Sequence, residues 1–87
     1  MAFYKILLKK SAEKELRHFP RHFIHKVLDK IKALSDNPRP VGSEMLAGEN
    51  AYFRVRQGDY RIVYEIDDTN HEVTVIKIGH RSEVYRK

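Results

Sequence analysis

Residues 52–66 read YFRVRQGDYRIVYEI, and this stretch decides the fold. Two runs rich in aromatic and β-branched residues flank the dipeptide Gly58-Asp59, which suits a tight turn between antiparallel strands. We therefore expect a β-hairpin with strands over residues 51–57 and 60–66.

Arginines alternate with apolar residues along the first strand of the hairpin. Because successive side chains of a strand point to opposite faces, Phe53 and Val55 share one face while Arg54 and Arg56 share the other. Holding an arginine on a strand costs side-chain entropy and desolvation, so several together favour an anionic ligand. Arg61 follows just beyond the turn, between apolar neighbours.

The chain before the hairpin predicts one strand and two helices. Alternation of apolar residues with lysines predicts a strand over 3–9. We expect Ser11 to cap a short helix and Pro20 to be the first residue of a second one. Two apolar stripes have helical spacing. They comprise Ala12, Leu16 and Phe19 in the first helix, and Ile24, Val27, Leu28, Ile31 and Leu34 in the second.

The remaining segments complete an α+β pattern. Residues 41–50 read as a loop anchored by Met45 and Leu46, residues 67–70 as a polar turn, and residues 72–78 as a further strand. The expected fold is an N-terminal strand, a two-helix pair and then a three-stranded antiparallel meander, with the helices covering one face of the sheet. We expect a single domain over residues 1–87, with its functional site on the other face.

Composition narrows the functional classes. The chain has 87 residues, no cysteine, 41% hydrophobic and 33% charged residues, and a net charge of +5. Residues 1–40 carry ten Lys/Arg against four Asp/Glu, which suits a nucleic-acid or acidic-protein partner. The only early apolar run is a short one at residues 6–8, so we expect neither a signal peptide nor a membrane span, and predict a cytoplasmic protein.

Three histidines raise the question of a metal site. His18, His22 and His25 have spacings of four and three, which would suit ligands on one helix. Pro20 separates the first two, and no carboxylate accompanies them. We therefore expect surface histidines and no bound metal.

The C-terminal residues complete an ordered set of motifs that resembles a known family. Residues 58–64 read GDYRIVY and residues 79–86 read GHRSEVYR, with LAG at 46–48 before them. In this order, and behind the N-terminal strand and helices, these motifs resemble the RelE toxins of the RelE/ParE superfamily of type II toxin–antitoxin systems. The resemblance covers nearly the whole chain. It implies an endoribonuclease without metal or cofactor that cuts mRNA in the ribosomal A site, by attack of a ribose 2′-hydroxyl on the adjacent phosphate.

The resemblance also implies residue roles. By position, Arg54 and Arg61 match basic residues that bind and stabilise the phosphate, and Arg56, on the same strand face as Arg54, joins them as a phosphate-binding candidate. Arg81 matches an arginine near the leaving oxygen. Tyr85 matches a tyrosine that orients the substrate at the reacting centre.

The chemistry of such a site can be judged from the residue types. Fixed guanidiniums stabilise the negative charge that builds on the non-bridging oxygens during the attack. Arginine is a poor general base because its pKa is about 12 or more, whereas tyrosine (about 10) and histidine (about 6.5) can move protons. Tyr85 and His80 are therefore the candidates for proton transfer. Tyr52 stands where some members have a lysine, so the choice of base stays open.

Structural roles compete with these assignments. Arg56 can pair with Glu65 or Asp59 across the hairpin, and Arg61 with Glu83. Two other functions also fit the resemblance: a ParE-like toxin that inhibits DNA gyrase by binding, and a catalytically weak member that binds its antitoxin and represses its own operon.

The resemblance implies a set of partners. The first is a small RelB-like antitoxin with an acidic amphipathic segment, which can lie over the basic helical pair or add to a sheet edge. The others are the ribosome with its mRNA, and operator DNA, which is bound only by the toxin–antitoxin complex.

Overall fold

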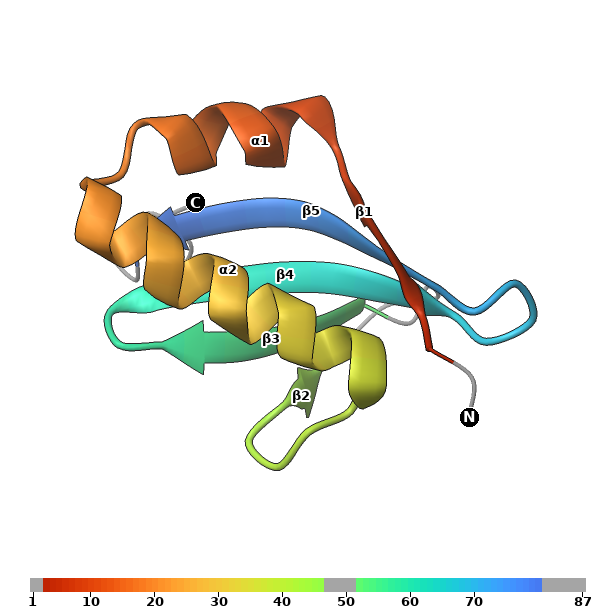
Figure 1. The fold of residues 1–87 in the computed structure, drawn as a ribbon. Coiled ribbons are helices and arrows are strands. Elements are labelled where there is room, and N and C mark those ends of the chain that lie inside the picture. Colours follow the sequence, from red (N-terminus) through yellow and green to blue (C-terminus); the bar gives the residue numbers. More distant parts are fainter. Residues whose placement is uncertain (1–2, 47–51, 81–87) are drawn as a thin grey trace.

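The computed structural model describes residues 3–46 and 52–80. Over these ranges the chain forms two helices and a five-stranded sheet in the order β1-β5-β4-β3-β2. The strands are β1 (Lys5–Leu8), β2 (Glu44–Met45), β3 (Tyr52–Gln57), β4 (Tyr60–Asp67) and β5 (Glu72–His80), and the helices are α1 (Lys10–Arg17) and α2 (Arg21–Asp36). Both helices lie over the same side of the sheet (Figure 1). The expected α+β class is confirmed.

Two features of the sheet differ from the expected meander. β1 pairs with β5 in parallel, whereas β5, β4, β3 and β2 follow one another antiparallel. β2 is an additional strand in a segment expected to be a loop. The parallel pairing follows from the topology: α1 and α2 carry the chain from β1 to β2 at the far edge, and the antiparallel strands then bring β5 back beside β1.

The β3–β4 hairpin forms where the sequence predicts it. Gln57 pairs with Tyr60 across the turn, and Gly58 has a φ of +62°. Glycine adopts this left-handed conformation without the steric cost that other residues pay. The turn fixes the register and therefore decides which side chains share a face.

The core lies between the helices and the sheet. Phe53 pairs with Tyr64 and Val55 with Ile62, so these four side chains share the covered face. The buried apolar side chains are Ala12, Leu16, Val27, Ile31, Leu34, Phe53, Val55, Tyr60, Ile62, Tyr64, Val73, Val75 and Ile78. The predicted apolar stripes of both helices contribute to this core. The opposite face of β3 is left for Arg54 and Arg56.

The predicted cap of the first helix is wrong. α1 begins at Lys10 with Lys9 in the N-cap position, and no side chain caps it. Ser11 lies inside the helix, where its hydroxyl donates a 3.3 Å hydrogen bond to the carbonyl of Ile76 in β5. The side chain is therefore used for a tertiary contact that no local pattern announces.

The second helix begins one residue later than expected. α2 starts at Arg21, and Pro20 is its N-cap rather than its first residue. The Pro20 carbonyl accepts from the amides of Phe23 at 2.9 Å and Ile24 at 3.1 Å. Proline suits this start because its missing N–H is not needed there.

Two apolar residues of the edge strands are exposed, and one of them was expected to be buried. Met45, expected to anchor the loop, is 69% exposed, and Leu8 is 39% exposed. β2 and β1 are the two edge strands of the sheet, so their side chains lie at the margin of the helical cover. Burial of Met45 was therefore predicted wrongly.

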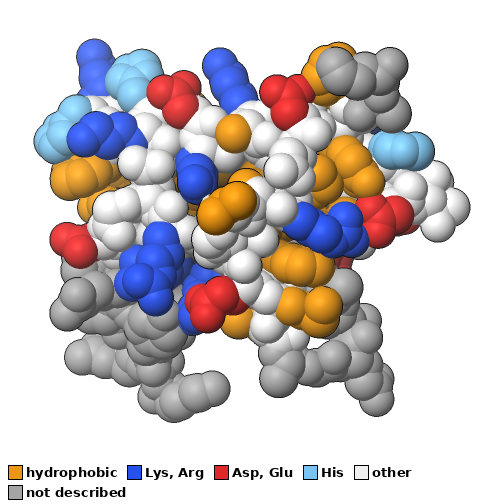
Figure 2. All heavy atoms as spheres, turned by 90° about the horizontal axis from the view of Figure 1, so that it is seen from below, with side chains coloured by type: hydrophobic (Ala, Val, Ile, Leu, Met, Phe, Trp, Pro, Cys, Tyr) orange, Lys and Arg blue, Asp and Glu red, His pale blue; other side chains and the backbone are white. Residues whose placement is uncertain are grey.

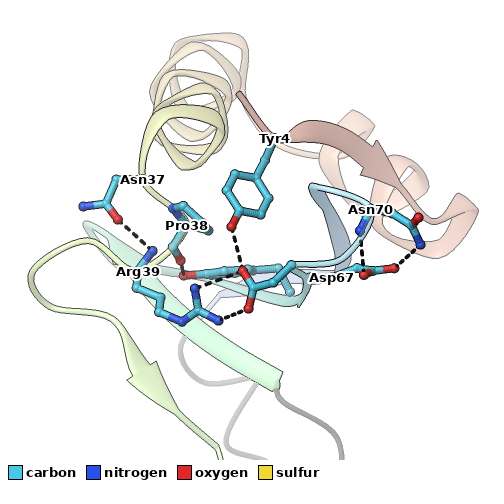
Figure 3. Close-up of polar contacts among 8 residues, drawn as sticks. Tyr4, Asn37, Pro38, Arg39, Asp67 and Asn70 are labelled. Carbon is cyan, nitrogen blue, oxygen red and sulfur yellow. Dashed lines mark hydrogen bonds and ion pairs between the residues drawn. The ribbon is translucent and has the colours of Figure 1, made fainter. Parts of the chain in front are cut away.

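A polar cluster fastens the end of the sheet at the β4–β5 turn. Tyr4 donates a 2.6 Å hydrogen bond to the Oδ1 of Asp68, and Arg39 donates to both oxygens of the same carboxylate, at 3.4 and 2.8 Å (Figure 3). The hydrogen bond from Arg39 holds the pKa of Asp68 below its usual value. This cluster ties the start of β1, the segment after α2 and the turn together, at the opposite end of β4 from Arg61.

Tyr64 links the core to the same segment. Its hydroxyl donates a 2.7 Å hydrogen bond to the Pro38 carbonyl, and its side chain is fully buried. Burial raises the pKa of this phenol to about 12.

Neither helix of the described ranges is long and apolar enough to cross a membrane.

Candidate anion site on the open face of the sheet

Three arginines meet on the face of the sheet opposite the helices. Arg54 and Arg56 lie on β3 and alternate with the buried Phe53 and Val55, as predicted. Arg61 lies on β4 directly opposite Arg56. On its other side Arg61 is opposite Gly79 of β5, which carries no side chain. The register thus brings two strand arginines into a like-charged pair, with Arg54 two residues away on the same face.

The three arginines differ in exposure. Arg56 is exposed, the Arg54 side chain is 14% exposed, and Arg61 is 6% exposed. Arg61 donates long hydrogen bonds to two hairpin carbonyls, those of Gly58 at 3.4 Å and Tyr60 at 3.3 Å. These contacts link the guanidinium to the hairpin turn. Arg56 is the most accessible of the three.

Sequence reasoning missed a carboxylate beside these arginines. Glu44 of β2 is opposite Arg54 in register and accepts a 2.5 Å hydrogen bond from it. This contact lowers the pKa of Glu44, and the charges of Arg56 and Arg61 lower it further. A two-residue strand has no periodicity that sequence analysis can detect, so its pairing with β3 was the missing signal.

The expected structural partners of Arg56 are not the observed ones. Glu65 lies opposite Tyr52, four residues along β4 from the partner of Arg56, so the register excludes that pair. Among residues 3–46 and 52–80, Arg56 and Asp59 do not form an ion pair. Both alternatives are therefore wrong, because the hairpin turn places Arg61, not a carboxylate, opposite Arg56.

The C-terminal candidates are only partly described. The backbone of His80 ends β5 opposite Tyr60, next to the Gly79–Arg61 pair. Arg81 and Tyr85 lie outside the described residues, as does Glu83, the proposed partner of Arg61. β5 thus leads toward the arginines at the point where the GHR motif begins.

The histidines of the helices are on the surface, as expected. His18, His22 and His25 are exposed, and His18 contacts the Lys14 carbonyl through its Nδ1 at 2.8 Å. Within the described ranges, no group of three or more His, Asp or Glu side chains is arranged to hold a metal ion.

This arrangement favours binding of an anion. Like charges opposite one another destabilise a strand pair, so Arg56 and Arg61 gain most when a negative group lies between them. On the surface seen from below, basic side chains are spread widely, and one group of them at the lower left has an acidic side chain beside it (Figure 2). A phosphate presents several acceptor oxygens to such a group of guanidiniums.

The chain matches known toxins over nearly its whole length. Residues 6–85 match the family described as "ParE toxin of type II toxin-antitoxin system, parDE". The chain is 31% identical over 84 residues to the toxin RelE of Mycobacterium tuberculosis, covering 95% of this chain and 87% of that protein.

Solved structures of known toxins also resemble this chain. The toxin–antitoxin complex RelBE2 of Mycobacterium tuberculosis contains a chain that matches with a TM-score of 0.82 and 28% identity, over 94% of this chain and 95% of that one. The isolated RelE toxin of Escherichia coli matches with a TM-score of 0.78 and 26% identity, over 94% and 90%. The chain therefore belongs to this family of toxins of type II toxin–antitoxin systems, within the RelE/ParE superfamily.

Proposed function

We propose that this chain is a ribosome-dependent endoribonuclease that cuts mRNA in the ribosomal A site and thereby inhibits translation. The observation that carries the proposal is the juxtaposition of Arg56 and Arg61 on the open face of the sheet, with Arg54 beside them. A scissile phosphate is the substrate group that such a set of guanidiniums suits best.

The proposed reaction is attack of a ribose 2′-hydroxyl oxygen on the adjacent phosphorus. The bond to the 5′-oxygen of the next nucleotide breaks, which leaves a 2′,3′-cyclic phosphate and a free 5′-hydroxyl. The hydroxyl proton goes to a general base, and the leaving oxygen takes a proton in turn. Arg54, Arg56 and Arg61 stabilise the charge on the non-bridging oxygens. Because carbonyl groups of the hairpin contact Arg61, its guanidinium is oriented before the phosphate binds, which lowers the entropic cost of the reaction.

The remaining roles rest on the family resemblance. Arg81 acts near the leaving oxygen, while Tyr85 and His80 are the candidates for orienting the substrate and transferring protons. The reaction as proposed needs neither metal nor cofactor, because the arginines supply the positive charge. The ribosome supplies the positioning that a site with weak acids and bases requires.

The proposed protein partner is a cognate RelB-like antitoxin. Several matching toxins were solved in RelB–RelE complexes, among them those of Mycobacterium tuberculosis and Pyrococcus horikoshii. The exposed basic residues of the two helices provide a surface for an acidic segment. They are Lys10, Lys14, Arg17, Arg21, Lys26 and Lys32. Operator DNA is proposed as a ligand of the toxin–antitoxin complex alone. The proposed location of the protein is the cytoplasm.

The family match also favours a second candidate function. The matching family is named for ParE toxins, so inhibition of DNA gyrase by binding is the alternative. A pure binder has no evident need for arginines paired across a strand, and this favours the nuclease.

Primer extension on mRNA in a reconstituted translation reaction tests the proposal. The wild-type chain, Arg56→Ala and Arg81→Ala are compared with and without ribosomes. Arg17→Ala is the matched control, since Arg17 is an exposed arginine on α1 that pairs only with Glu13 among the described ion pairs. We expect ribosome-dependent cuts that Arg17→Ala retains and the two site variants lose. Absence of cuts from a folded wild-type chain, together with inhibition of gyrase supercoiling, would transfer the assignment to the second candidate.

A further inference from the structure

One edge of β5 changes partner part of the way along the strand. β1 pairs with β5 only as far as Leu8, opposite Val75, and the amide of Lys9 then donates a 3.0 Å hydrogen bond to the Val75 carbonyl. From there the chain turns into α1. The backbone groups of β5 beyond Val75 that point away from β4 must therefore find other partners.

Beyond the end of β1, two side chains of α1 form hydrogen bonds with the backbone of β5. Ser11 donates to the Ile76 carbonyl at 3.3 Å, and the Oε1 of Glu15 accepts from the Ile78 amide at 3.0 Å. Four helical residues rise about 6 Å, which matches the roughly 6.6 Å spanned by two strand residues. Ser11 and Glu15 thus follow the edge of β5 as a neighbouring strand would. We call this pair the α1 clamp.

Glu15 is the stronger member of the α1 clamp. Its Oε2 accepts a 2.8 Å hydrogen bond from the Nζ of Lys77, so one carboxylate holds both the backbone and a side chain of β5. Hydrogen bonds to an ionised acceptor are about twice as strong as neutral ones. Glu15 and Lys77 are only partly exposed, at 32% and 45% of their side-chain surface.

The α1 clamp acts where the sheet itself constrains β5 least. The register between β4 and β5 shifts at Val63 and Tyr64, whose partners are Lys77 and Val75, so Ile76 is an extra residue. A bulge of this kind interrupts the ladder and bends the strand. The contacts of α1 fall on residues 76–78, which are the bulge and the two residues after it.

We infer that Glu15 is a positioning residue for the nuclease site, an inference that rests on the proposed function. It holds Lys77 and Ile78 immediately before Gly79, which is opposite Arg61, and before the rest of the GHR motif. Glu15 acts through the strand, from the helical side of the sheet, and makes no contact with the phosphate. It sets the path along which β5 delivers its C-terminal residues to the arginines.

The test compares four variants in the ribosome-dependent cleavage reaction. Glu15→Ala removes both contacts of Glu15 with β5. Glu15→Gln keeps an acceptor for the Ile78 amide. Lys77→Met removes only the contact between the Glu15 and Lys77 side chains. Glu13→Ala is the matched control, because Glu13 lies on the same helix in an exposed pair with Arg17. Thermal unfolding and hydrogen exchange at the Ile78 amide are measured for each variant.

We expect Glu15→Ala to lower kcat by about tenfold or more, since small misplacements of reacting groups cost up to about a hundredfold. KM should change less than about threefold, because the inference gives Glu15 a role in positioning and none in substrate binding. Exchange at Ile78 should accelerate. Glu15→Gln should recover most of the activity, and Glu13→Ala should match the wild type in every measurement.

Two results would overturn the inference separately from the proposed function. One is a folded Glu15→Ala variant that cleaves like Glu13→Ala, and the other is a kcat loss no larger than the lost folded fraction. A wild-type chain that leaves mRNA intact on ribosomes would instead overturn the proposed function, and the positioning role with it.

Discussion

Arg56 and Arg61 lie directly opposite each other on β3 and β4, on the face of the sheet that the helices leave uncovered. Two guanidiniums in this relationship repel, and the repulsion costs roughly 0.2–1 kcal/mol. The repulsion between the two guanidiniums opposes folding, whereas both guanidiniums attract a bound phosphate. Substitutions of these arginines should therefore change the stability of the protein and its cleavage activity in opposite directions.

Replacing Arg56 by Gln should raise stability and lower activity together. The substitution removes one charge and keeps most of the side-chain length, so we expect the free energy of unfolding to rise by a few tenths of a kcal/mol at low salt. Cleavage on the ribosome should fall by about tenfold or more, since a preorganised donor is lost. Urea unfolding and primer extension measure the two effects.

High salt provides the control for the Arg56 prediction. The stability gain should shrink as ionic strength rises, because Arg56 is exposed and its repulsion is screened. A loss of stability in Arg56→Gln would mean that Arg56 has a structural partner after all.

Glu44 should compete with phosphate for Arg54. Its carboxylate accepts the 2.5 Å hydrogen bond that a phosphate oxygen would otherwise take. We expect Glu44→Gln to bind more tightly to ribosomes programmed with an mRNA that carries a 2′-deoxy nucleotide at the cut site. Affinity measured by filter binding, against Glu13→Gln as the exposed control, tests this expectation. Unchanged or weaker affinity would show that Glu44 orients Arg54 instead of blocking it.

Acid should weaken the same pair. Arg54 depresses the pKa of Glu44 below the ordinary value of 4.5, so the pair contributes to stability above that value. The contribution is lost as the pH falls through the lowered pKa of the folded state. The difference in unfolding midpoint between the wild type and Glu44→Gln should therefore vanish at the acidic end of a pH series.

The hairpin, the paired faces and the core were all predictable from the sequence, because alternation and the Gly-Asp turn are local signals. Phe53, Val55, Arg54 and Arg56 lie where period two places them. By contrast, Ser11 looked like a helix cap because its partner, the Ile76 carbonyl, is 65 residues away. Tertiary hydrogen bonds of this kind leave no periodic trace.

The arginines of the candidate site were predictable from the sequence, but the carboxylate of Glu44 beside them was not. Arg54, Arg56 and Arg61 stand out because charged residues interrupt apolar strands. Glu44 does not, since it lies in a polar segment and gains its meaning only from pairing with β3. The burial of Arg61 was equally invisible, as were the contacts of its guanidinium with the Gly58 and Tyr60 carbonyls.

Replacing Gly58 by Ala should destabilise the hairpin without a clash. The φ of +62° is unfavourable for alanine by about 1–2 kcal/mol, while an added Cβ would meet no atom within 4 Å. We expect Gly58→Asn to cost less, since asparagine tolerates this conformation better. Urea unfolding of both variants checks the order, and a larger loss in Gly58→Asn would mean that side-chain volume, not backbone conformation, decides the turn.

Alkaline pH should reveal the buried phenol of Tyr64. The folded protein keeps this group neutral until its pKa of about 12, whereas the unfolded chain ionises near 10.0. Ionisation therefore favours unfolding between these values: the stabilisation is complete below pH 10 and is lost as the pH rises to 12, by up to about 3 kcal/mol. Tyr64→Phe should be less stable than the wild type at pH 7 by about 1–2 kcal/mol, since the buried Pro38 carbonyl loses its donor. The same variant should lose less stability between pH 10 and 12. A Tyr64→Phe curve parallel to the wild type would assign the alkaline transition to another tyrosine, such as Tyr4, whose pKa is raised by its hydrogen bond to Asp68.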